Sequence, residues 1–121
     1  MRILLIEPNR EPRPSAINDA LEAMQQIVGG PIQAVYPFEE PVALVCNEEA
    51  KLDSLPPNRA LRDEDGNMYD IVCGTVFLCA APPDSENLES LTEEQIDRYT
   101  RLFQRPEIFL RINGEIVAVP V

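Results

Sequence analysis

Apolar residues gather along the chain in five stretches with the density or alternation typical of β-strands. These stretches are residues 2–7 (RILLIE), 32–38 (IQAVYPF), 42–46 (VALVC), 68–80 (MYDIVCGTVFLCA) and 108–121 (IFLRINGEIVAVPV). The unbroken apolar run of the third stretch indicates a strand that is buried on both faces of a sheet. Gly74 interrupts the fourth stretch, and a glycine inside a strand usually marks a bulge or a close approach of two backbones.

The last stretch predicts a β-hairpin, because Asn113-Gly114 is a preferred pair for a type I′ turn between two strands. In the register of a two-residue turn, one face of this hairpin becomes a continuous aliphatic surface, while Arg111 lies on the opposite face. The aliphatic residues are Ile108, Leu110, Ile112, Val117 and Val119.

Two other stretches place apolar residues at the helical spacing i, i+3, i+4 and i+7. The first covers residues 16–28, with Ser15 as its N-cap and a Gly-Gly pair directly after it that suits a helix end. The second helix follows Thr92, which is expected to form a capping box with Gln95 three residues later.

The predicted order of elements is β-α-β-β-β-α-β-β. This order defines a single α+β domain over residues 1–121, with a mostly antiparallel sheet, two helices and a C-terminal β-hairpin. A chain of 121 residues can bury a core without metals or disulfides. Cys46, Cys73 and Cys79 lie in apolar contexts without CxxC spacing, so we expect free thiols rather than disulfides or a zinc site.

The net charge of −11, from 21 acidic and 10 basic residues, is high for this length. Such a field repels the phosphates of nucleic acids and the anionic surface of membranes, so we expect no direct binding to either. It suits high solubility or binding to a partner with a basic surface. The sequence has no apolar run of membrane-spanning length and no secretory signal pattern, so we expect a cytoplasmic protein.

The residues that most enzymes rely on are missing. The sequence has no histidine, which removes the commonest general base and the usual ligand of catalytic zinc. Its glycines never form a phosphate-binding loop. Aligned with a calcium-binding EF-hand loop, Asp63 and Asp65 fall at ligand positions, but Leu61 and Val72 fall where oxygen donors are required. We therefore predict no catalytic residue, no metal and no cofactor.

A cluster of acidic residues covers the loop before the second helix and the first turns of that helix. It consists of Asp84, Glu86, Glu89, Glu93, Glu94 and Asp97. A row of carboxylates can imitate a phosphate backbone and occupy the basic cleft of a DNA-binding protein. The alternative is an ordinary solvated helix start, because the helix dipole favours acidic residues there.

The polar segment between the third and fourth stretches concentrates amides and bases in a chain poor in bases. Its candidate ligand- or partner-binding residues are Asn47, Glu48, Glu49, Lys51, Asn58, Arg59 and Arg62. A double proline presents Asn58 and Arg59 from a stiff, extended support. Amide and guanidinium groups suit a carboxylate, a phosphate or a nucleobase edge. In the alternative, the asparagines satisfy loop backbone groups and the arginines pair with Glu48, Glu49 and Asp63.

The same segment carries a family resemblance. Residues 28–79 resemble the core of an uncharacterised domain family of bacterial mobile elements and phages, catalogued as domain of unknown function three-eight-four-six. The matching features are Gly29-Gly30, the block from Asn47 to Leu52, Leu55-Pro56, Asn58-Arg59, Asp70 and Gly74. Ala50 departs from the pattern, where glycine is expected. The resemblance implies an accessory protein of a phage or conjugative element in the bacterial cytoplasm, and it implies no activity or catalytic residue.

Three kinds of function fit this sequence. The first is a non-enzymatic acidic binding protein of a phage or mobile element, which acts on a host protein with a basic surface in a counter-defence or regulatory role. The second is a protein that binds or sequesters a small anionic ligand, such as a nucleotide signal, through Asn47, Asn58, Arg59 and Arg62. The third is a carboxylate- or metal-dependent enzyme. Formation of a homo-oligomer is open in each case.

Overall fold

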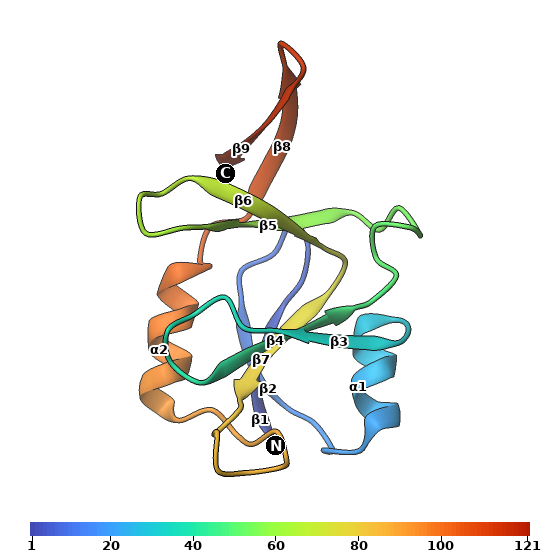
Figure 1. Ribbon diagram of the computed structural model, residues 1–121, viewed down its shortest axis with the longest axis vertical. Helices are drawn as coiled ribbons and strands as arrows, with labels where there is room; N and C mark the ends of the chain where they lie inside the picture. Colours follow the sequence, from blue (N-terminus) through green and yellow to red (C-terminus); the bar gives the residue numbers. More distant parts are fainter.

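The computed structural model describes residues 1–121 and contains a five-stranded antiparallel sheet, two separate hairpins and two helices (Figure 1). The sheet has the order β2-β1-β7-β4-β3, with β1 at Arg2–Ile6, β2 at Arg13–Ala16, β3 at Ile32–Val35, β4 at Val42–Asn47 and β7 at Val76–Ala80. One hairpin joins β5 (Pro57–Arg62) to β6 (Met68–Cys73), and the other joins β8 (Glu107–Ile112) to β9 (Glu115–Pro120). The helices are α1 (Leu21–Val28) and α2 (Glu93–Leu102). The α+β class, the antiparallel pairing and the C-terminal hairpin are confirmed.

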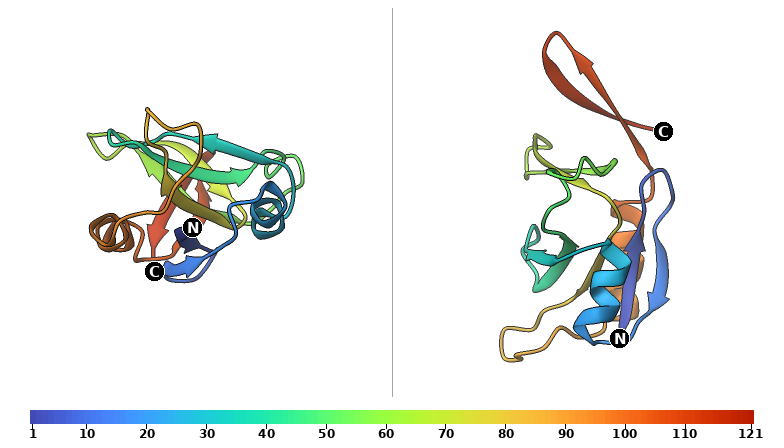
Figure 2. Two further views of the ribbon diagram at one scale, coloured as in Figure 1. Left: turned by 90° about the horizontal axis from the view of Figure 1, so that it is seen from below. Right: turned by 90° about the vertical axis from the view of Figure 1, so that its right-hand side faces the viewer.

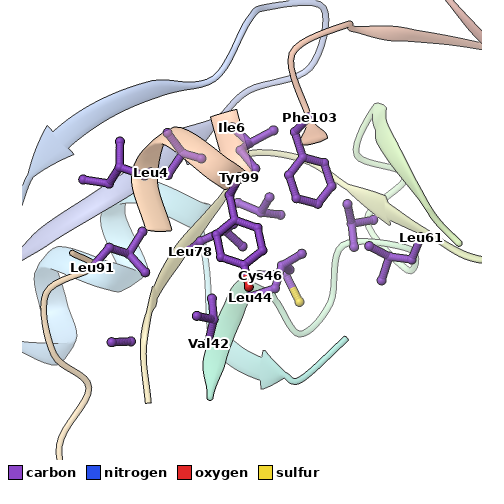
Figure 3. Close-up of a cluster of buried hydrophobic side chains, with 14 residues drawn as sticks. Leu4, Ile6, Val42, Leu44, Cys46, Leu61, Leu78, Leu91, Tyr99 and Phe103 are labelled. Carbon is purple, nitrogen blue, oxygen red and sulfur yellow. The ribbon is translucent and has the colours of Figure 1, made fainter. Parts of the chain in front are cut away.

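The central strands are buried on both faces because α1 and α2 lie on opposite flanks of the sheet (Figure 2). Every residue of β4 is buried, and its side chains alternate between two apolar clusters. Val42 and Leu44 join the cluster under α2, where Tyr99 and Phe103 close the core (Figure 3). The alternate residues of β4 join the cluster under α1. This two-sided burial explains the unbroken apolar runs of the sequence.

The predicted start of the first helix was wrong. Ser15, the expected N-cap, lies in β2 and pairs with Ile3 of β1. Prolines on either side of Arg13 favour an extended backbone, and the free edge of β1 offers hydrogen bonds to it. Helix α1 begins only at Leu21, after Asn18 has accepted a hydrogen bond from the Ala20 N–H at 2.8 Å. Its end is as expected, at Gly29 with φ 82°.

The long apolar stretch of residues 68–80 forms two strands. Gly74, with φ 74°, separates β6 from β7, and a Cβ atom at this position would lie 2.8 Å from Cδ1 of Leu55. A side chain at Gly74 would therefore meet both a strained backbone and a steric clash. The break lets β6 leave the sheet and pair with β5, a strand within the polar segment for which no strand was predicted.

The structure confirms α2 and the C-terminal hairpin, which short sequence motifs had predicted. The Gln95 N–H donates to Oγ1 of Thr92 at 3.2 Å, and the Thr92 N–H donates to Oε1 of Gln95 at 2.9 Å, which completes the capping box. Asn113 and Gly114 have φ values of 52° and 81°, as a type I′ turn requires. Neither helix has the length and apolar composition needed to cross a membrane.

All three cysteines are free, and Cys73 and Cys79 lie in different strands. Cys79 is fully buried, and burial raises the pKa of its thiol from 9.0 to about 12. Burial likewise raises the pKa of Cys46 and of Cys73. The folded protein therefore keeps these thiols protonated and poorly reactive at neutral pH.

We expect the stability of the protein to fall in alkaline solution, in part because of Cys79. The thiol of the unfolded chain loses its proton near pH 9.0, whereas the folded one keeps it to about pH 12. The contribution of the Cys79 thiol to stability is therefore complete below pH 9.0 and decreases by about 1.4 kcal/mol per pH unit between pH 9.0 and about 12. Urea unfolding of the wild type and Cys79→Ala across this range measures the effect. The variant should show a shallower alkaline decline, and equal slopes would contradict the assignment.

Candidate functional site

Asn58 holds three parts of the chain together. It is fully buried, and its Nδ2 donates to the carbonyl oxygens of Ile6 at 2.9 Å and Gly74 at 2.8 Å. These bonds attach β5 to the end of β1 and to the break between β6 and β7. Its Oδ1 accepts a hydrogen bond from Arg59 at 2.8 Å, so the amide has no group free for a ligand.

Arg59 is 1% exposed, and its guanidinium binds backbone oxygens. Nε and Nη2 donate to the carbonyl of Phe103 at 3.2 and 3.0 Å, and Nη2 also donates to the carbonyl of Arg10 at 2.6 Å. Nη1 donates to the carbonyl and the side chain of Asn58. Burial lowers the pKa of Arg59, an effect that the negative charge of Glu107 opposes. The residue therefore caps the end of α2 and fixes the loop after β1.

Asn47 has a similar structural role at the end of β4. It is 4% exposed, and its Nδ2 donates to the carbonyl of Val28 at 3.3 Å, while its Oδ1 accepts from the Glu49 N–H at 2.8 Å. Glu48 and Glu49 are exposed beside it. Lys51 is also exposed and forms a 2.6 Å ion pair with Asp70, and this contact is the main cause of its raised pKa.

The seven predicted site residues do not converge on one surface. Asn47 and its neighbours lie at the end of β4, Asn58 and Arg59 lie inside the protein, and Arg62 faces the base of the C-terminal hairpin. The geometry supports the interpretation in which asparagines satisfy backbone groups. The expected partners of the arginines were wrong, because Arg59 binds carbonyl oxygens and Arg62 binds Glu107.

Glu107 anchors the C-terminal hairpin to the rest of the protein. Its side chain is 6% exposed, its Oε2 lies 2.6 Å from Nη2 of Arg62, and its Oε1 accepts from the Ala60 N–H at 3.0 Å. Glu107 was not among the predicted site residues, because nothing in its local sequence distinguishes it from the exposed acids.

The hairpin presents a half-exposed aliphatic face, on which Glu115 lies opposite Ile112. Its register pairs Ile108 with Val119 and Leu110 with Val117, as predicted. We call the five aliphatic residues of this face the hairpin face. Their exposed fractions are 49% for Ile108, 45% for Leu110, 50% for Ile112, 37% for Val117 and 38% for Val119. The opposite face carries the buried Glu107 and the half-buried Phe109 and Ala118. Figures 1 and 2 show the hairpin extending beyond the body of the protein.

The acidic cluster lies at the other end of the molecule. Its residues follow β7 and form the start of α2, at the end opposite the hairpin in Figure 1. All six are exposed, namely Asp84, Glu86, Glu89, Glu93, Glu94 and Asp97. Glu93 forms an ion pair with Arg2 at 2.8 Å. No group of three or more histidine, cysteine or acidic side chains is placed to hold a metal ion.

Fold and surface together define a small acidic α+β protein that carries an exposed apolar hairpin. The sequence model of the family described as "Domain of unknown function (DUF3846)" matches residues 1–104, and the chain belongs to this family. The matched region ends before Glu107, where β8 begins. No curated protein and no solved structure matches this chain.

Proposed function

We propose that the protein is a non-enzymatic binding protein that docks its hairpin face into an apolar groove on a partner protein with basic residues around that groove. The observation that supports this proposal most strongly is the hairpin face, with five aliphatic side chains each at least 37% exposed. Contiguous exposed apolar surface of this kind is a property of interaction sites.

The hairpin itself gains from being covered. An isolated two-stranded hairpin has marginal stability in water, and packing one face against another surface supplies the missing apolar burial. Here the inner face is held to β5 through Glu107, a cavity of about 620 Å³ lies between Phe109 and β6, and the hairpin face has no cover. A partner groove would bury it.

Charge favours a basic partner over a second copy of this chain. Each copy carries a net charge of −11, so two copies repel one another, whereas a basic surface is attracted. The exposed part of the hairpin is nearly neutral, with Arg111 and Glu115 as its exposed charges. The apolar contact and the long-range attraction therefore come from different parts of the molecule.

The proposal also includes a setting. The family resemblance points to a phage or mobile element, so the partner we propose is a protein of the bacterial host cytoplasm. Binding would block or regulate that protein in a counter-defence or accessory role, without chemistry carried out by this chain.

The experiment is affinity capture from bacterial host lysate with wild type and Leu110→Ser/Val117→Ser. Burying each leucine or valine contributes about 1.5–3 kcal/mol to binding. The amount of partner that the variant retains should therefore be at least about tenfold lower than for wild type. Capture by wild type should also weaken as salt rises, because charge attraction is screened.

The matched control is Leu21→Ser/Leu52→Ser, which removes two side chains that are 52% and 86% exposed outside the hairpin. It should capture the partner as wild type does. Undiminished capture by the hairpin variant, or self-association as the only binding seen, would overturn the proposal.

A further inference from the structure

One cavity of this acidic protein is lined mainly by basic side chains rather than acidic ones. A cavity of about 390 Å³ lies between the end of α2, the hairpin of β5 and β6, and the base of the C-terminal hairpin. This volume is within the usual range for small-molecule sites. Four arginines line the cavity, namely Arg59, Arg62, Arg101 and Arg105. They are four of only 10 basic residues in a chain of net charge −11.

The two carboxylates that line the cavity are already engaged. Glu107 binds Arg62 and the Ala60 N–H. Asp63 accepts hydrogen bonds from the N–H groups of Asp65 and Asn67 within its own turn. No acidic side chain forms an ion pair with Arg59, Arg101 or Arg105, although the negative charge of Glu107 acts on Arg59. The positive charge of these guanidinium groups would attract an anion into the cavity.

Two of the arginines have donors available for such an anion. The side chain of Arg101 makes no hydrogen bond and no ion pair with the rest of the protein. The side chain of Arg105 uses only Nε, which donates to the Val121 carbonyl at 3.2 Å. Arg59 contributes charge but no free donor, because it binds the carbonyl of Phe103. That contact also screens the negative end of the α2 dipole from the cavity.

The remaining wall is apolar and aromatic. Phe38, Leu102 and Pro120 line it, together with Tyr69, which is 57% exposed. Guanidinium groups bind phosphate through paired hydrogen bonds, and an exposed aromatic ring offers a stacking surface for a flat heterocycle.

We propose that this cavity binds a phosphate monoester with a flat ring, the chemistry of a nucleoside monophosphate, with the phosphate on Arg101 and Arg105 and the ring against Tyr69. The site shares only Arg59 and Arg62 with the ligand-binding residues predicted from the sequence. None of its lining residues belongs to the hairpin face, so the ligand and a docked partner protein would contact different side chains.

The test is calorimetric titration of the full chain with AMP, adenosine and inorganic phosphate. AMP should bind more tightly than either of the others, since only AMP reaches both the arginines and the ring. Arg101→Gln/Arg105→Gln should weaken AMP binding by about 100-fold, because each charge-assisted contact accounts for about tenfold or more. Arg101→Lys/Arg105→Lys keeps the positive charge but lacks the planar guanidinium group. Its affinity for AMP should lie between that of wild type and that of Arg101→Gln/Arg105→Gln.

The matched control is Arg13→Gln/Arg111→Gln, which removes the same charge from two exposed arginines outside the cavity and should bind AMP as wild type does. Thermal unfolding of each variant separates loss of binding from loss of fold. The proposal is overturned if AMP does not bind at millimolar concentration, if adenosine or phosphate binds as tightly as AMP, or if the control weakens binding as much as the cavity variant.

Discussion

Arg59→Ala is expected to remove most of the stability of the protein. The substitution leaves the buried carbonyl of Phe103 and the buried side chain of Asn58 without their donor, and it removes a partly buried hydrogen bond to the carbonyl of Arg10. A buried polar group without a partner costs about 1–3 kcal/mol, and the lost side chain also leaves a cavity. The sum, about 4 kcal/mol or more, is a large part of the roughly 5–15 kcal/mol that stabilises a typical domain. Urea unfolding followed by circular dichroism measures it.

Arg98→Ala is the control for this prediction. Arg98 belongs to α2, is 52% exposed and forms a surface ion pair with Glu40 at 3.0 Å, so its loss should cost no more than about 1 kcal/mol. If Arg59→Ala destabilised the protein no more than Arg98→Ala, the structural role of Arg59 would be refuted, and a role in ligand binding would regain support.

Glu107→Ala is expected to release the C-terminal hairpin as well as to destabilise the protein. The Ala60 N–H loses its buried acceptor, and Arg62 loses its ion-pair partner. Removing one partner from a buried charge pair costs about 3–5 kcal/mol, and the 39% exposure of Arg62 brings the expectation down to about 2–4 kcal/mol. Amide hydrogen exchange across residues 107–120 should accelerate more than exchange in the central sheet.

Two substitutions sharpen this result. Glu115→Ala removes an exposed acid from the same hairpin and should change stability by no more than about 0.5 kcal/mol. Glu107→Gln keeps an oxygen that can accept from Ala60, so its effect should be smaller than that of Glu107→Ala. An equal and small effect of Glu107→Ala and Glu115→Ala would show that the hairpin is held by other contacts.

Features encoded by neighbouring residues were predictable from the sequence. The capping box of Thr92 and Gln95 needs only a spacing of three residues, and the turn at Asn113-Gly114 needs only two residues that accept positive φ. The pairing of aliphatic residues on the hairpin face then follows from the register of that turn.

Features that depend on distant contacts were not predictable. Arg59 binds carbonyls 44 and 49 residues away, and Glu107 binds an N–H 47 residues away, so neither shows a local pattern. The strand β2 forms because β1 offers it an edge, and it includes Ser15, which the sequence had indicated as a helix N-cap. The arginine cavity likewise brings together β5 and the end of α2, which no spacing in the sequence connects.

Hydrogen–deuterium exchange on the protein, free and bound to its captured partner, tests the proposed docking most directly. Residues 107–120 should exchange at least about tenfold more slowly in the complex, because the hairpin face is then shielded and the hairpin opens less often. Exchange across the central sheet should stay unchanged. Protection confined to residues 81–97, with the hairpin exchanging as in the free protein, would contradict docking through the hairpin face and would favour binding through the acidic cluster.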